Sequence, residues 1–167
     1  VTPPTYLGMP GPRYAELHCK TNFSFLEGAS HPDELALRAA ELGLAALAIT
    51  DRNTLAGIVR AHGAAKDLGL RLIIGAEIHL SDAPAVLLWT TDRASYGRLS
   101  RLITRGRRQA PKGEFHLTLD ELAEHAEGLM CGVLVGDALE PQLDGTCASK
   151  LAPFREIFTD RSYLVAE

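Results

Sequence analysis

The chain has 167 residues, of which 46% are hydrophobic and 23% charged, a composition that is ordinary for one soluble globular domain. Its 17 basic and 21 acidic side chains give a net charge of −4, which argues against an overall electrostatic attraction to nucleic acid but leaves room for a local basic patch. No apolar run approaches the roughly 20 residues that cross a bilayer, so no membrane association is expected. The three cysteines lack metal-ligand spacing and indicate reduced thiols in a cytoplasmic protein.

The first predicted elements are a flexible arm and a strand. Residues 1–13 hold four prolines and two glycines, which discourage regular structure. Residues 14–18 alternate as a strand does, and a polar loop follows as far as a predicted turn at Gly28. This loop carries His18 and Glu27, which can bind a metal or transfer a proton. The plainer alternative is a solvated His and Glu at the end of a strand.

Helices and strands alternate through the rest of the chain. Ser30 is predicted to cap the first helix, with Pro32 in its first turn and Asp33 at the spacing of a capping box, and Gly43 ends it. Further elements follow from the apolar periodicity. They are strands at 44–49, 70–78, 86–89, 129–135 and 162–166, helices at 54–68, 92–108 and 151–158, a short helix starting at Thr118, and loops at 50–53 and 137–149.

This alternation predicts an α/β fold with parallel strands and helical crossovers. Residues 162–166 read as an apolar strand with no closing helix after it, which would leave an open sheet edge. We therefore expect residues 14–167 to be the front portion of a larger, truncated domain, or another segment to cover this edge.

The helix predicted at 92–108 carries arginines at helical spacing on the side opposite its apolar residues. The plain interpretation is a solvated face. The functional one is a stripe that contacts nucleic-acid phosphates or docks an acidic partner. The residues of this stripe are Arg98, Arg101, Arg105 and Arg108.

Several polar side chains follow the ends of predicted parallel strands, which meet at one rim of such a fold. Besides His18 and Glu27 they are Asp51 and Glu77, a set that could hold a divalent metal. Lys20 and Arg52 accompany them, and cations there would repel a metal or form salt bridges with these acids instead.

Three ordered motifs carry a resemblance to a known family. They are residues 17–30 (LHCKTNFSFLEGAS), 48–57 (AITDRNTLAG) and 73–77 (IIGAE). The chain resembles the PHP (polymerase and histidinol phosphatase) domain, and in particular the amino-terminal PHP domain of bacterial C-family DNA polymerases of the polymerase III alpha type. Residues 22–25 (NFSF) and 91–99 (TDRASYGRL) are similar to the error-prone branch of these polymerases.

The resemblance implies a distorted (β/α)7 barrel, present here in part, whose active members hold zinc or manganese for phosphoester hydrolysis. His18 matches the first histidine of the family's His-x-His pair, and Lys20 stands where the second should be. Glu27 matches an acidic ligand and Glu77 the bridging glutamate. Arg52, next to the matching Asp51, replaces the histidine of Thr-Asp-His, and Ala85 lies where another histidine is frequent.

These substitutions suggest that the segment is a catalytically silent PHP module with a structural or docking role and no cofactor. The metal remnant would be His18, Glu27 and Glu77. The implied parent is a DNA-directed DNA polymerase active in replication or translesion synthesis. Its partners would be the remainder of the polymerase chain, DNA bound through the full-length protein, and mutasome or replication proteins.

Two other functions stay open. One is an active phosphoesterase or 3′–5′ exonuclease that uses zinc or manganese. It would need further ligands, and the histidines without a role, besides His31, are His62, His79, His116 and His125. The other is an interaction protein that uses the arginine stripe. The polymerase reaction itself has no place in this segment, because the resemblance covers only the amino-terminal module.

Overall fold

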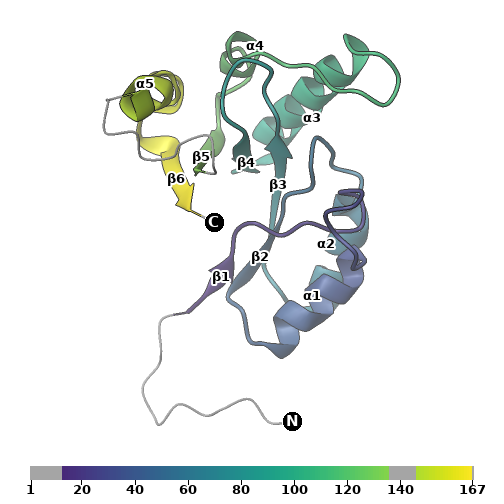
Figure 1. Cartoon of the computed structure of the whole chain (residues 1–167). Coiled ribbons are helices and arrows are strands. Elements are labelled where there is room, and N and C mark those ends of the chain that lie inside the picture. The colour runs from purple at the N-terminus through teal and green to yellow at the C-terminus, as the bar shows by residue number, and fades with distance from the viewer. Residues whose placement is uncertain (1–12, 136–145, 167) are drawn as a thin grey trace. The chain divides into compact units, whose positions relative to one another are not determined.

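The computed structural model describes residues 13–135 and 146–166 (Figure 1). The described chain forms two compact units. The first unit comprises residues 13–51 and 56–74, and the second comprises residues 52–55, 75–135 and 146–166. The predicted arm lies outside the described residues except for Arg13.

Three strands pair in parallel in the first unit: β1 (Ala15–Glu16), β2 (Ala46–Ile49) and the beginning of β3 (Leu72–Ile78). Two helices, α1 (Pro32–Glu41) and α2 (Ile58–Leu68), pack against each other, and α1 also contacts β2 (Figure 1). β2 is buried along its whole length, as its continuous apolar run predicts. The buried positions of both helices include small residues that allow close packing: Ala36, Ala39, Ala61 and Ala65.

The second unit contains a mixed sheet. The end of β3 pairs antiparallel with β4 (Val86–Thr90), β4 pairs antiparallel with β5 (Leu129–Val135), and β5 pairs parallel with β6 (Ser162–Ala166). Its helices are α3 (Arg93–Arg108), α4 (Leu119–Ala123), α5 (Thr146–Phe158) and the short 3₁₀ helix η2 (Thr159–Arg161).

One apolar core fills the second unit. Leu99 and Leu102 of α3 and Phe154 and Phe158 of α5 are fully or almost fully buried and belong to the same cluster as Leu88 of β4. A single cluster that joins helices and strands is what holds this unit together, because burial of apolar surface is the main favourable term in folding.

The α/β class is confirmed, but the expectation of parallel strands throughout is wrong. The link between β3 and β4, residues 79–85, contains no helix, and such a short link joins antiparallel neighbours. Parallel pairing with a helical crossover occurs at β1–β2, β2–β3 and β5–β6.

Three helices begin elsewhere than predicted: α1, α2 and also α5, which begins at Thr146 rather than 151. His31, not Ser30, is the N-cap of α1, and the Glu34 carboxylate, not Asp33, accepts a hydrogen bond from the His31 backbone N–H at 2.7 Å. Pro32 accounts for the difference, because proline favours the first helical position and so places the cap directly before it. α2 begins at Ile58 rather than 54, and residues 54–57 form irregular chain and a turn before it.

The other predicted elements agree closely. Asp92 caps α3 and Thr118 caps α4, each through a hydrogen bond from a backbone N–H three residues later. The predicted loop 137–149 falls partly outside the described residues, and its last residues, from Thr146, already belong to α5.

Candidate functional site

The loop that follows β1 is organised around the buried carboxylate of Asp51, which is 1% exposed. Its Oδ1 accepts hydrogen bonds from the Thr21 backbone N–H at 2.7 Å and from the Ser24 hydroxyl at 2.7 Å. Its Oδ2 accepts one from the Thr21 hydroxyl at 2.8 Å. Both oxygens of Asp51 are therefore occupied in fixing the loop, and such hydrogen bonds to a charged acceptor are among the stronger ones in proteins.

Two glycines let this loop close upon itself. A side-chain carbon at Gly28 would collide with the backbone carbonyl of Thr21. One at Gly57 would lie 3.0 Å from Asp51 Oδ2 and 3.2 Å from the ring of Phe23. The turn predicted at Gly28 thus depends on glycine for close backbone approach.

Lys20 and Glu27, at the two ends of the loop, form an ion pair. Lys20 Nζ lies 2.6 Å from Glu27 Oε2, and the two side chains are 24% and 28% exposed. One of the predicted acid–cation pairs is therefore present, between the lysine that replaces a family histidine and the glutamate that matches a family ligand.

His18 and Cys19 lie between β1 and this loop. The His18 backbone N–H donates to Glu16 Oε1 at 3.0 Å, and the Cys19 backbone N–H donates to the Thr50 hydroxyl at 3.0 Å. Burial, followed by the charges of Glu16 and Asp51, raises the pKa of the Cys19 thiol to about 11. The thiol is therefore protonated near neutral pH, where it is a poor nucleophile and a poor metal ligand.

The second unit holds a separate polar cluster around Glu77. Its carboxylate is 2% exposed, and Glu77 Oε1 lies 2.5 Å from His79 Nε2. Asn53 adopts a left-handed conformation (φ 52°) and bridges the two residues. Its N–H donates to the Glu77 carbonyl at 2.7 Å, and its Oδ1 accepts from the His79 N–H at 3.0 Å.

His79 is one of the histidines to which the sequence alone assigned no role. The signal that could have found it is its spacing of two from Glu77, because residues two apart on a strand point to the same face. Arg52 reaches the same cluster through its backbone bridge to Glu77, and its side chain is exposed.

The predicted site residues are divided between the units. His18, Lys20, Glu27 and Asp51 belong to the first unit, and Arg52 and Glu77 belong to the second. That these six residues converge on one rim of the fold stays a prediction. Over residues 13–135 and 146–166, no group of three or more His, Cys, Asp or Glu side chains is arranged to hold a metal ion.

The remaining histidines have other surroundings. His62 and His116 are exposed, and His125 Nδ1 lies 2.9 Å from the Glu121 carbonyl oxygen. The ring of His31 contacts the Asn22 side chain, with 2.9 Å between His31 Nδ1 and Asn22 Nδ2.

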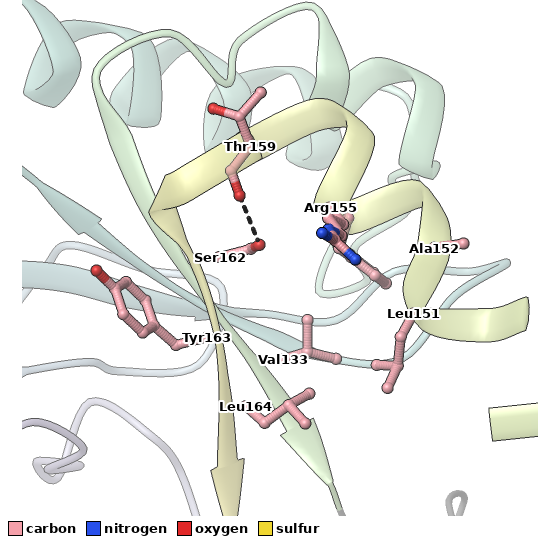
Figure 2. Close-up of a pocket in the computed structure, with 9 residues that line it drawn as sticks. Val133, Leu151, Ala152, Arg155, Thr159, Ser162, Tyr163 and Leu164 are labelled. Carbon is pink, nitrogen blue, oxygen red and sulfur yellow. Dashed lines mark hydrogen bonds between the residues drawn. The ribbon is translucent and has the colours of Figure 1, made fainter. Parts of the chain in front are cut away.

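The second unit also has a concavity of about 420 Å³ between α5, β5 and β6 (Figure 2). Val133, Leu151 and Leu164 form its apolar wall, and the Ser162 hydroxyl donates to the Thr159 carbonyl at 3.2 Å beside it (Figure 2). Arg155 is the charged residue of the lining, and no carboxylate, imidazole or thiol of the described residues lines it. This hollow therefore lacks the groups for metal or acid–base chemistry.

Structural comparison shows what fold this is. A proposed metal-dependent phosphoesterase from Bifidobacterium adolescentis matches 87% of this chain and 76% of its own with a TM-score of 0.63 at 17% identity. An amidohydrolase from Chromobacterium violaceum matches 81% of this chain and 74% of its own with a TM-score of 0.53 at 18% identity. At such low sequence identity, these two matches show that the fold is shared and nothing more.

The family follows from the sequence match, since the model of the PHP domain matches residues 16–161. The chain belongs to the PHP domain family. The PHP-type fold inferred from the three motifs is therefore confirmed.

Curated relatives of this PHP chain are error-prone DNA polymerases. The polymerase of Rhodopirellula baltica is 51% identical in an alignment of 160 positions that covers 92% of this chain and 14% of that protein. That of Aromatoleum aromaticum is 49% identical in an alignment of 170 positions that covers 99% of this chain and 16% of that protein. The chain thus matches the PHP part of much longer polymerases, and the predicted resemblance to the error-prone branch is confirmed.

The described part of this PHP chain contains no helix with the length and apolar character needed to cross a bilayer.

Proposed function

We propose that this chain is the PHP module of an error-prone C-family DNA polymerase and that its role there is structural or docking rather than hydrolytic. The identity to error-prone polymerases supports the parentage. On this proposal the chain works in the cytoplasm with the remainder of the polymerase, and it meets DNA and replication proteins as part of that larger protein.

The Lys20–Glu27 ion pair is the observation that carries the structural role. A metal bound by Glu27 would have to displace an ammonium group 2.6 Å from that carboxylate or accept its positive charge as a close neighbour. Asp51 offers no replacement, because its two oxygens already accept three hydrogen bonds from the loop. The donor groups of the first unit therefore fit a metal ion poorly.

One observation favours the alternative of a metal-dependent phosphoesterase or 3′–5′ exonuclease. Glu77 and His79 juxtapose a buried carboxylate and an imidazole, both of which bind zinc and manganese in proteins. Because two ligands hold such ions weakly, this pair would need others to make a working centre.

Metal analysis separates the two functions. The purified chain is dialysed with zinc and with manganese, its metal content is measured, and hydrolysis of a phosphoester and of a 3′-labelled oligonucleotide is assayed. We expect well below one metal per chain and no hydrolysis above buffer. About one metal per chain, with hydrolysis that His18→Ala abolishes, would overturn the proposed role.

A gain-of-function variant sharpens this test. Lys20→His combined with Arg52→His returns imidazoles to the two positions where the family carries them and removes two positive charges. We expect this variant to retain more zinc than the unchanged chain. The matched control is Arg71→His with Lys112→His, which removes the same charge at one exposed position of each unit. Equal zinc uptake by both variants would mean that the replaced positions do not form a site.

A further inference from the structure

α3 is the most basic element of a chain that is acidic overall. It carries six arginines and no acidic residue in 16 positions, while the whole chain has a net charge of −4. Three of these arginines have partners inside the protein, and the other three, Arg93, Arg101 and Arg108, are exposed.

Three arginines have internal partners. Arg98 pairs with Glu127 at 2.5 Å, and Arg105 pairs with Glu121 at 2.9 Å and with Glu124 at 2.5 Å. Arg107 donates to the Asn53 carbonyl at 3.1 Å and stacks on the ring of Phe115. These contacts tie α3 to α4 and to the surrounding loops of the second unit.

Arg101 and Arg108 differ from them. Both are exposed, and neither has a hydrogen-bond or ion-pair partner within the described parts of the second unit. Together with Arg105 they line a concavity of about 440 Å³, whose other lining residues are Ser100, Thr104 and Gln109. The lining therefore presents guanidinium, hydroxyl and amide groups, and no carboxylate of the described chain belongs to it.

The lining matches the chemistry of phosphate oxygens. Guanidinium groups recognise phosphate through paired N–H donors, and the Ser100 hydroxyl can add a further donor. The Thr104 hydroxyl donates to the Ser100 carbonyl at 2.8 Å, and the Gln109 amide nitrogen donates to the His116 carbonyl and the Glu121 carboxylate, so these two side chains line the concavity without offering a free donor. Arg105 is held in place by Glu121 and Glu124 through its Nε and Nη1, so its orientation is set before a ligand arrives. Two free arginines beside one fixed arginine favour an anion with several charges along its length.

The spacing of the free arginines fits a nucleic-acid strand. Residues seven apart in an α-helix lie about 10 Å apart along the axis. Measured along the axis of a DNA duplex, that length corresponds to about three steps of roughly 3.4 Å each. No aromatic side chain lines the concavity, so base stacking would not contribute.

We propose that the α3 concavity, formed by Ser100, Arg101, Thr104, Arg105, Arg108 and Gln109, binds the sugar-phosphate backbone of DNA without sequence preference. The choice of DNA over an acidic protein rests on the proposed function as part of a DNA polymerase. Binding by the chain alone would be weak, in the range of about 10⁻⁴–10⁻⁶ M that is common for non-specific contacts.

The test measures the anisotropy of a fluorescein-labelled DNA duplex titrated with the whole chain at several salt concentrations. Arg101→Glu with Arg108→Glu is expected to weaken binding at least tenfold at low salt. It should also reduce the slope of log K against log salt by about two, because two phosphate contacts are lost. Arg105 is left unchanged because its ion pairs with α4 are structural.

The matched control is Lys66→Glu with Arg71→Glu, which changes the net charge equally at exposed positions of the first unit. An equal loss in both variants would overturn the proposal by showing that only overall charge matters, as would absence of binding at low salt. Tighter binding of an acidic peptide of equal charge would overturn it in favour of a protein partner. Thermal unfolding of each variant, with Arg101→Gln and Arg108→Gln as a milder pair, checks that the fold is intact.

The result of the DNA-binding test is independent of the result of the metal analysis. If DNA binding fails while the chain stays free of metal and hydrolytic activity, this inference alone is wrong and the proposed structural role stands.

Discussion

The loop after β1 shows how single residues set the geometry of the candidate site. Asp51 holds the loop from inside, and Gly28 lets the chain pass against the Thr21 carbonyl. The sequence identified both positions, but it suggested a metal neighbour for Asp51 and an ordinary turn for Gly28. Their actual roles depend on which backbone groups come close in space, and spacing along the chain does not show that.

Gly28→Ala is expected to destabilise the chain by about 3 kcal/mol or more, because the new methyl group can be accommodated only by moving backbone. Gly43→Ala is the matched comparison. Gly43 has a left-handed φ of 69° and no atom within 4 Å of an added carbon, so its replacement should cost only about 1–2 kcal/mol of conformational strain. Urea unfolding of both variants measures the difference. Equal losses would mean that the loop opens freely at Gly28.

At the scale of secondary-structure elements, the bounds of α3 agree with the prediction, whereas the contacts of its arginines differ from it. Its start at Asp92, its end at Arg108 and its inward residues Leu99 and Leu102 all agree with the sequence pattern. The four arginines predicted as one stripe do not act alike, however. Arg98 and Arg105 pair with glutamates that follow α3 in the chain, at positions that no helical periodicity could reveal.

Asp92→Ala should lower the stability of the second unit, because Asp92 Oδ1 accepts the Ser95 backbone N–H at 2.7 Å at the start of α3. For the loss of a helix cap in a chain of this size we expect Tm to fall by about 2–4 °C. That hydrogen bond lowers the pKa of Asp92, so the stabilisation is present above its ordinary pKa of 3.8 and disappears as acid protonates the folded carboxyl.

Thermal unfolding at pH 7 and at about pH 3 measures both effects. Asp67→Ala, an exposed carboxylate near the end of α2, serves as the control and should change Tm little. A loss that is equally large after acidification would show that the Asp92 cap is not responsible.

At the scale of the whole molecule, the first unit half-buries the thiol of Cys19 and the second buries that of Cys131. Burial raises the pKa of Cys131 to about 12, and burial with nearby carboxylates raises that of Cys19 to about 11, from an ordinary value of 9.0. The folded chain therefore holds protons that the unfolded chain releases above pH 9. The sequence indicated reduced cysteines, and their protonation at alkaline pH follows from burial in the folded chain.

The free energy of unfolding should consequently fall as the pH rises from about 9 towards 12, by at most about 1.4 kcal/mol per pH unit for each thiol. Urea unfolding at several alkaline pH values measures this slope, and Cys19→Ser and Cys131→Ala should each make it shallower. Alkylation of Cys19 by iodoacetamide should be slow at pH 7.5 and faster towards pH 11. An unchanged slope in both variants would assign the alkaline loss of stability to other groups.

The amino-acid sequence by itself determined the α/β class, the order of the elements, the caps of α3 and α4 and the PHP family. These properties depend on local periodicity, on contacts three residues apart and on motifs continuous in the chain. Only the tertiary structure decided that β4 runs antiparallel to β3 and β5, that Lys20 neutralises Glu27 and that Glu77 meets His79 and Asn53. It also decided that Arg101 and Arg108 of α3 stay open to solvent beside the paired Arg105. The reason is physical: the state of a charged group depends on which neighbours folding brings within a few ångströms, and most of those neighbours lie far away along the chain.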